Sequence, residues 1–97
     1  MDNTKLLAYI QKPVIYHTDA GHGWFAVKRD VLAALEILQQ VSSYSYMRGA
    51  TVYLEEDCDA SRYFSAVRAR FGRDPAYITK HTDRSPIRSY DYFRVQS

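Results

Sequence analysis

Apolar and polar positions recur along the chain with two periods, and they predict strands separated by helices. The clearest signal is a β-hairpin. Apolar, β-branched and aromatic residues dominate 14–18 and 24–28, and the five residues between them include Gly21 and Gly23. A tight reversal requires positive φ, which glycine adopts at no steric cost, so these two glycines are expected to supply it.

Two stretches with helical spacing follow the hairpin. In the first, Asp30 is expected to cap a helix that carries Val31 and Leu35 on its apolar face and continues to residue 41. The second spans 60–71 and ends at Gly72, a residue type suited to the left-handed position after a helix. Its apolar stripe consists of Ala60, Tyr63, Phe64, Val67 and Phe71.

The remaining segments predict three further strands, at 50–54, 77–80 and 87–95. The element order is then ββαβαββ, with short hairpin links at both ends. This order favours an α+β fold: a small, mostly antiparallel sheet of about four or five strands with two helices packed on one face.

The length of 97 residues predicts one domain spanning 1–97. Its first 13 residues have two interpretations. Leu6 and Ile10 fit the apolar face of a short helix beginning at Asp2 or Asn3, which Pro13 would end. Alternatively, residues 1–13 form a loosely attached N-terminal segment.

Composition narrows the class of protein. Apolar residues make up 46% and charged residues 25%, as in an ordinary globular protein. No apolar run approaches the roughly 20 residues that cross a bilayer, and the first residues lack the basic-then-apolar pattern of a signal peptide. We therefore expect a cytoplasmic protein without membrane contact. The single cysteine, Cys58, excludes an internal disulfide and a cysteine-rich zinc site.

Tyrosine is unusually frequent, at nine of the 97 residues. A tyrosine joins a large apolar ring to a polar hydroxyl, so it suits surfaces that are wet when free and dry when bound. Each tyrosine has a plainer interpretation, in which its ring lies at the core boundary with the hydroxyl outward.

The acidic run 55–59 is the densest cluster of chemical groups. Three interpretations remain open for it. Asp57 or Asp59 could cap the helix that follows, where carboxylates also complement the helix dipole. The run could dock on a basic protein surface, or it could hold a divalent cation, although the EF-hand spacing is absent.

Evidence for catalysis is weak. His17, Asp19 and His22 surround the first turn and could form a metal site, but such spacing arises often by chance. Cys58 lacks the local signature of a catalytic nucleophile. We therefore expect no catalytic residues, no metal site and no cofactor, and a protein that is not an enzyme.

The last predicted strand suggests a nucleic-acid interface. Alternation places Arg88, Tyr90, Tyr92 and Arg94 on one face, and Arg68 and Arg70 add positive charge. Tyrosine rings stack on bases and arginines pair with phosphates, which is how a sheet binds single strands. The same face could instead anchor a protein, or it could be a solvated sheet face with cation–π pairs.

Four segments carry a resemblance to a known group of proteins: 22–24 (HGW), 44–46 (YSY), 53–59 (YLEEDCD) and 87–90 (IRSY). In this order they resemble small uncharacterised proteins encoded by phages, plasmids and other mobile elements of proteobacteria. The resemblance implies a genomic context and no catalytic residues.

That context suggests a stoichiometric inhibitor of a bacterial defence system, similar to anti-CRISPR proteins and acting in the host cytoplasm. Its partner would be a host defence protein or ribonucleoprotein complex, bound by a monomer or homodimer. The expected protein-binding residues are Tyr44, Tyr46, Glu55, Glu56, Asp57 and Asp59. The alternatives are a nucleic-acid-binding accessory protein and, third, a small metal-dependent enzyme.

Overall fold

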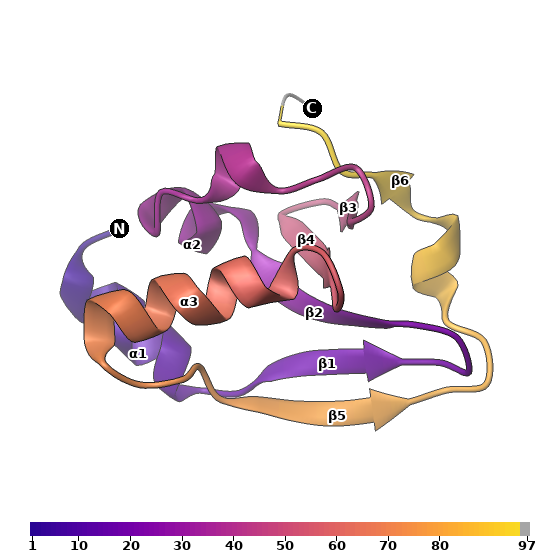
Figure 1. The fold of residues 1–97 in the computed structure, drawn as a ribbon, viewed down its shortest axis with the longest axis horizontal. Coiled ribbons are helices and arrows are strands. Elements are labelled where there is room, and N and C mark those ends of the chain that lie inside the picture. Colours follow the sequence, from indigo (N-terminus) through magenta and orange to yellow (C-terminus); the bar gives the residue numbers. More distant parts are fainter. Residues whose placement is uncertain (96–97) are drawn as a thin grey trace.

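Residues 1–95 form a six-stranded sheet with three helices on one face (Figure 1). The computed structural model describes residues 1–95. The helices are α1 (Asn3–Gln11), α2 (Arg29–Ala34) and α3 (Ala60–Phe71). The strands are β1 (Val14–Thr18), β2 (Gly23–Lys28), β3 (Tyr46–Arg48), β4 (Thr51–Glu55), β5 (Tyr77–His81) and β6 (Asp91–Tyr92). Two short 3₁₀ turns, η1 (Leu38–Gln40) and η2 (Pro86–Ser89), complete the chain.

The predicted α+β class is confirmed, whereas the number and order of strands differ. The sheet order is β5-β1-β2-β4-β3-β6, and every pair is antiparallel except β1 with β5. The parallel pair arises because α3 carries the chain from β4 across the sheet to its far edge before β5 begins. The expected hairpin between the last two strands is therefore wrong: β5 and β6 lie at opposite edges (Figure 1).

One apolar core joins the helices to the sheet. Phe25 and Val27 of β2, with Val52 and Leu54 of β4, point toward the helices and are buried. All three helices contribute buried side chains to the same cluster: Leu6 and Ile10 from α1, Val31 and Leu32 from α2, and Ala60, Tyr63 and Val67 from α3. The residues that alternate with these along the strands face away from the core.

The first residues are part of this core. The Asp2 side chain accepts a hydrogen bond from the Lys5 amide (2.8 Å) and so caps α1. Leu6 is fully buried and Ile10 is 1% exposed. Of the two interpretations of residues 1–13, the short helix is the one observed.

The helix predicted to reach residue 41 is wrong, because α2 ends at Ala34. Glu36 has φ 63°, and its amide donates to Ala33 O while the amide of Ile37 donates to Leu32 O. This is the Schellman arrangement that terminates helices, and here it buries Ile37 together with Leu32. The expected cap by Asp30 is also wrong: the N-cap position is Lys28, and Asp30 lies within the first turn.

The glycines of the hairpin turn do not have positive φ, contrary to expectation. The positive values occur at Gly49, between β3 and β4, and at Gly72, which ends α3 as predicted. Gly23 is required for space instead: a Cβ there would overlap the ring of Tyr16. Tyr16 in turn stacks on Phe25 with ring centroids 4.2 Å apart.

The single strand predicted over 87–95 is replaced by η2 and the two-residue strand β6. Pro86 fits the first position of the 3₁₀ turn, and the Ser85 hydroxyl accepts from the Ile87 amide (3.2 Å). Ile87 is 2% exposed. The burial of Ile87 and this local cap favour a 3₁₀ turn at 86–89, where a strand was expected.

Asp59, an expected helix cap, makes a different contact. It occupies the N-cap position of α3, but its side chain caps no helical amide. Its carboxylate is 1% exposed and accepts hydrogen bonds from the amide and hydroxyl of Ser42 and from the hydroxyl of Ser45. Asp59 therefore ties the segment before β3 to the start of α3.

Replacing this carboxylate should destabilise the fold. In Asp59→Ala the half-buried groups of Ser42 and the buried hydroxyl of Ser45 lose their acceptor, and we expect a loss of roughly 2–4 kcal/mol in the free energy of unfolding. Urea denaturation followed by circular dichroism measures it. Asp57→Ala, at an exposed position of the same run, is the control and should change stability by less than about 0.5 kcal/mol. Equal effects of the two substitutions would contradict this role.

Candidate functional site

The sheet face opposite the helices, here called the open face, carries aromatic and basic side chains. Directly paired residues share a face, so the strand pairing identifies its members. They are Ile15, His17, Trp24, Ala26, Lys28, Tyr46, Arg48, Thr51, Tyr53, Glu55, Ile78 and Lys80. None of them belongs to the apolar core. Among these strand residues Glu55 is the one acid, so the open face is basic.

The connection from β5 to β6 adds further rings and charge to this face. It runs along the end of the sheet at which the β1–β2 turn lies (Figure 1). Arg88 lies over the Trp24 ring (5.5 Å from its centroid), and Tyr90 packs on Tyr53 (5.2 Å). Arg48 in turn lies 4.9 Å from the centre of the Tyr90 ring. Rings and guanidinium groups therefore alternate across the face.

His17 extends this row of rings, since its ring centre lies 6.0 Å from that of Tyr53. Burial and the nearby Lys80 charge lower the pKa of His17. The imidazole is therefore neutral at pH 7 and contributes an aromatic surface rather than a charge.

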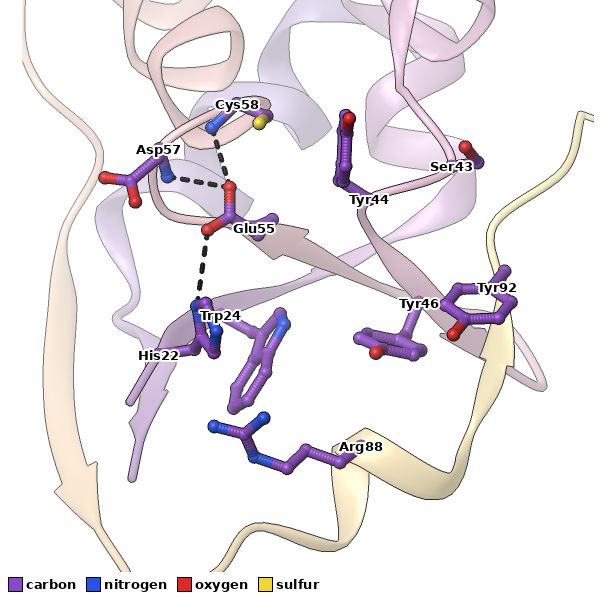
Figure 2. Close-up of a pocket in the computed structure, with 10 residues that line it drawn as sticks. All are labelled: His22, Trp24, Ser43, Tyr44, Tyr46, Glu55, Asp57, Cys58, Arg88 and Tyr92. Atoms are coloured by element: carbon purple, nitrogen blue, oxygen red, sulfur yellow. Dashed lines mark hydrogen bonds and ion pairs between the residues drawn. The ribbon is translucent and has the colours of Figure 1, made fainter. Parts of the chain in front are cut away.

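A cavity of about 560 Å³ opens where β2 begins and β4 ends (Figure 2). It is lined by His22, Trp24, Ser43, Tyr44, Tyr46, Glu55, Asp57, Cys58, Arg88 and Tyr92. Each of the four segments 22–24, 44–46, 53–59 and 87–90 contributes at least one lining residue, and only Ser43 and Tyr92 of the ten lie outside them. The fold thus brings the four motifs together around one cavity.

Aromatic rings form one side of the cavity. Tyr46 stacks on Tyr92, with ring centroids 5.2 Å apart and planes at 24°. Trp24 meets Tyr46 at a steep angle, 72°, with 6.1 Å between centroids. The Trp24 side chain is nearly fully buried, and its Nε1–H has no hydrogen-bond acceptor among residues 1–95. The cavity therefore has a stacking surface beside an unpartnered donor.

Glu55 occupies the opposite side and is 8% exposed. Its Oε2 accepts from the amides of Asp57 (2.9 Å) and Cys58 (2.8 Å), while its Oε1 lies 4.0 Å from His22 Nδ1 (Figure 2). One carboxylate oxygen thus fixes the turn after β4, and the other remains available as an acceptor.

Cys58 is poorly suited to nucleophilic attack. The adjacent Glu55 carboxylate, followed by desolvation and the other neighbouring carboxylates, raises the pKa of its thiol. The thiol therefore stays protonated at neutral pH, whereas the thiolate is the reactive form.

Arg88 is held in place by Asp19. The buried Asp19 carboxylate accepts from Arg88 Nε (2.6 Å) and Nη2 (2.9 Å), and from the amides of Gly21, His22 and Ser85. The Arg88 hydrogen bonds, more than these amides, hold the pKa of Asp19 well below its usual range. This ion pair joins the hairpin turn to the β5–β6 connection.

The alternative interpretation of the first turn, a metal site formed by His17, Asp19 and His22, is not favoured by the geometry of these residues. Asp19 is bonded to Arg88, and His17 faces Tyr53. A different trio, His22, Glu55 and Glu56, places its potential ligand atoms within 4.8 Å of one another. Glu56, however, accepts a hydrogen bond from the Tyr16 hydroxyl, which a cation would have to displace.

The expected protein-docking residues divide into three groups by exposure. Glu55 and Asp59 are buried and make the internal hydrogen bonds described above, so they are not available as a docking surface. Tyr46 and Glu56 are half-buried. Tyr44, at 70% exposure, and Asp57 are exposed beside the cavity.

The expected nucleic-acid residues also divide. Arg88, Tyr90 and Tyr92 all contact rings of the open face. Arg68 and Arg70 instead lie on α3, where they bond to Asp74 and to Ala34 O. Arg94 is exposed, and its carbonyl accepts from Arg29. Sequence reasoning missed Lys28, Arg48, Tyr53 and Lys80. Alternation along the individual strands was the available signal.

Comparison with known proteins finds no match. This holds for protein-family models, for curated proteins and for solved structures. Among residues 1–95, no helix combines the length and the apolar composition needed to cross a membrane. The function therefore has to be argued from the open face and the cavity.

The Asp19–Arg88 pair predicts a pH dependence of stability. Because its folded pKa is depressed, the Asp19 carboxylate stabilises the fold above its ordinary pKa of 3.8, and this contribution is lost as pH falls toward the lower folded value. We expect Asp19→Asn to have a clearly lower Tm than the parent at pH 7, and the gap to narrow progressively as pH falls below about 4. Asp83→Asn, at an exposed loop position, should show no gap. A gap for Asp19→Asn that is the same at pH 7 and pH 3 would refute the assignment.

Proposed function

We propose that the protein binds single-stranded nucleic acid on its open face. The observation that carries this proposal is the row of rings His17, Tyr53 and Tyr90 with Arg48 at its end. Aromatic rings on a sheet stack on unpaired bases without regard to sequence, and neighbouring cations pair with phosphates. Function by binding rather than catalysis remains part of this proposal.

The charges of the open face support it. Lys28, Arg48 and Lys80 are exposed, and within residues 1–95 none of them forms an ion pair with a carboxylate. The arginines of α3, by contrast, pair with Asp74 and Glu36. The net charge is only +2, yet these three unpaired cations all lie on the face that carries the rings.

A groove of about 340 Å³ lies on this face, and a single nucleic-acid strand could bind along it. It lies between Ile15 and Tyr53 and is bordered by Lys12 and Lys28. Backbone phosphates along the groove would therefore meet positive charge, while bases reach Tyr53.

Fluorescence anisotropy with labelled single strands of about ten nucleotides tests the proposal. We expect binding at low ionic strength that weakens steeply with salt, because phosphate contacts release counterions. Arg48→Gln should weaken binding by about three- to tenfold and reduce the salt slope by about 0.7 for the lost contact. Arg68→Gln, on α3, is the matched control and should bind like the parent. Absence of binding at low salt, or equal losses in the two variants, would contradict the proposal.

A second candidate is docking to a bacterial defence protein or ribonucleoprotein complex as an inhibitor. The observation that favours it is the exposure of Tyr44 and Asp57 at the rim of one cavity, because exposed tyrosines are frequent interface anchors.

Size-exclusion chromatography with purified defence complexes tests this candidate. Co-elution should weaken at least about tenfold in Tyr44→Ala, since a buried interface tyrosine contributes more than about 1.4 kcal/mol. Ile78→Ala, on the exposed edge strand β5, should leave it unchanged. A complex that is insensitive to Tyr44 would exclude this rim as the contact.

A further inference from the structure

The cavity is continuous with the open face. Tyr46 is paired directly with Tyr53, and Trp24 directly with Glu55, so the cavity walls and the row of rings lie on the same side of the sheet. A nucleic-acid strand bound along the open face therefore reaches the cavity, which has a volume suited to a base with its sugar.

The cavity's hydrogen-bonding groups are complementary to the polar edge of a base. Glu55 Oε1 is an acceptor with no hydrogen-bond donor bound to it among residues 1–95, whereas Oε2 is already occupied. Trp24 Nε1–H is a buried donor without an acceptor. An entering group must therefore present a donor to Glu55 and an acceptor to Trp24, or leave buried polar groups unpaired.

Stacking and charge favour the base rather than the phosphate in the cavity. The Tyr46 ring stacks on Tyr92 and meets Trp24 at a steep angle, so a planar ligand in the cavity would lie against aromatic surface. The Arg88 charge is compensated by Asp19, whereas Glu55 and Asp57 remain negative. A phosphate would be repelled there and would be directed to the cations of the open face.

We propose that the cavity takes one nucleobase of the bound strand, stacked on Tyr46, and selects bases that bear an exocyclic amino group donating to Glu55 Oε1. This inference rests on the proposed function and names its ligand. Cytosine, adenine and guanine carry such an amino group, whereas uracil places a carbonyl oxygen at the same position. The carbonyl oxygen of uracil would face the Glu55 carboxylate, and neither group could donate a hydrogen bond to the other. A buried polar site strongly disfavours a ligand that leaves its groups unpaired in this way.

The single tryptophan, Trp24, provides the measurement, because its ring lines the cavity and no other tryptophan contributes to the signal. CMP and UMP have nearly the same shape and differ at the amino group, so both are titrated into the protein. We expect CMP to bind at least about tenfold more tightly than UMP. AMP and IMP form a second pair with the same difference, and the same preference is expected.

Glu55→Gln distinguishes recognition from a structural role. The amide keeps an oxygen for the amides of Asp57 and Cys58, but its NH₂ can donate to a carbonyl, so the CMP-to-UMP ratio should fall toward one. Asp83→Asn is the control with an unchanged ratio, and thermal unfolding checks that both variants fold.

The nucleotide titrations test the cavity, and the anisotropy assay with labelled strands tests the open face. Equal responses to CMP and UMP, no response to either, or a ratio unaffected by Glu55→Gln would overturn the cavity assignment. If labelled strands still bind by anisotropy, the open-face proposal stands without it. If the strands do not bind, both fail.

Discussion

The ion pair between Asp19 and Arg88 is the interaction on which the functional surface depends. The chain must cross from β5 at one edge of the sheet to β6 at the other, and few apolar side chains guide it besides Ile87. Asp19 binds Arg88 and the Ser85 amide, and so fixes this connection to the β1–β2 turn. With the connection fixed, Arg88 covers Trp24, Tyr90 reaches Tyr53 and β6 reaches β3.

Buried carboxylates have a similar role on the other side of the cavity. Glu55 closes the turn after β4, and Asp59 holds the serines that precede β3. Much of the acidic run is thus directed inward, where it satisfies amide and hydroxyl donors. Its removal from the surface is one reason that a chain of nearly balanced charge presents a basic sheet face.

Local signals predicted the elements whose causes are local. The hairpin, the stripe of α3 and its stop at Gly72 follow from spacing within a few residues. Pairing between distant segments was not predictable: nothing within 77–81 indicates a parallel partner at β1. The role of Asp59 was not predictable for a related reason. An aspartate can cap a helix or accept hydrogen bonds from distant serines, and the sequence shows the same residue in both cases. Alternation along each strand indicates which side chains share a face of the sheet. It does not indicate which of the two faces the helices cover, because that depends on the tertiary fold.

The shortness of β6 affects how the cavity is bounded. Tyr92 lies on a strand of two residues at the sheet edge, is 66% exposed, and packs against Tyr46. Phe93, the residue after Tyr92, is buried in the apolar core, and its amide donates to Ser45 O (2.8 Å). The backbone of β6 is therefore held in place directly after Tyr92. Rotation of the exposed Tyr92 side chain alone changes the width of the cavity on this side, without breaking a strand pair.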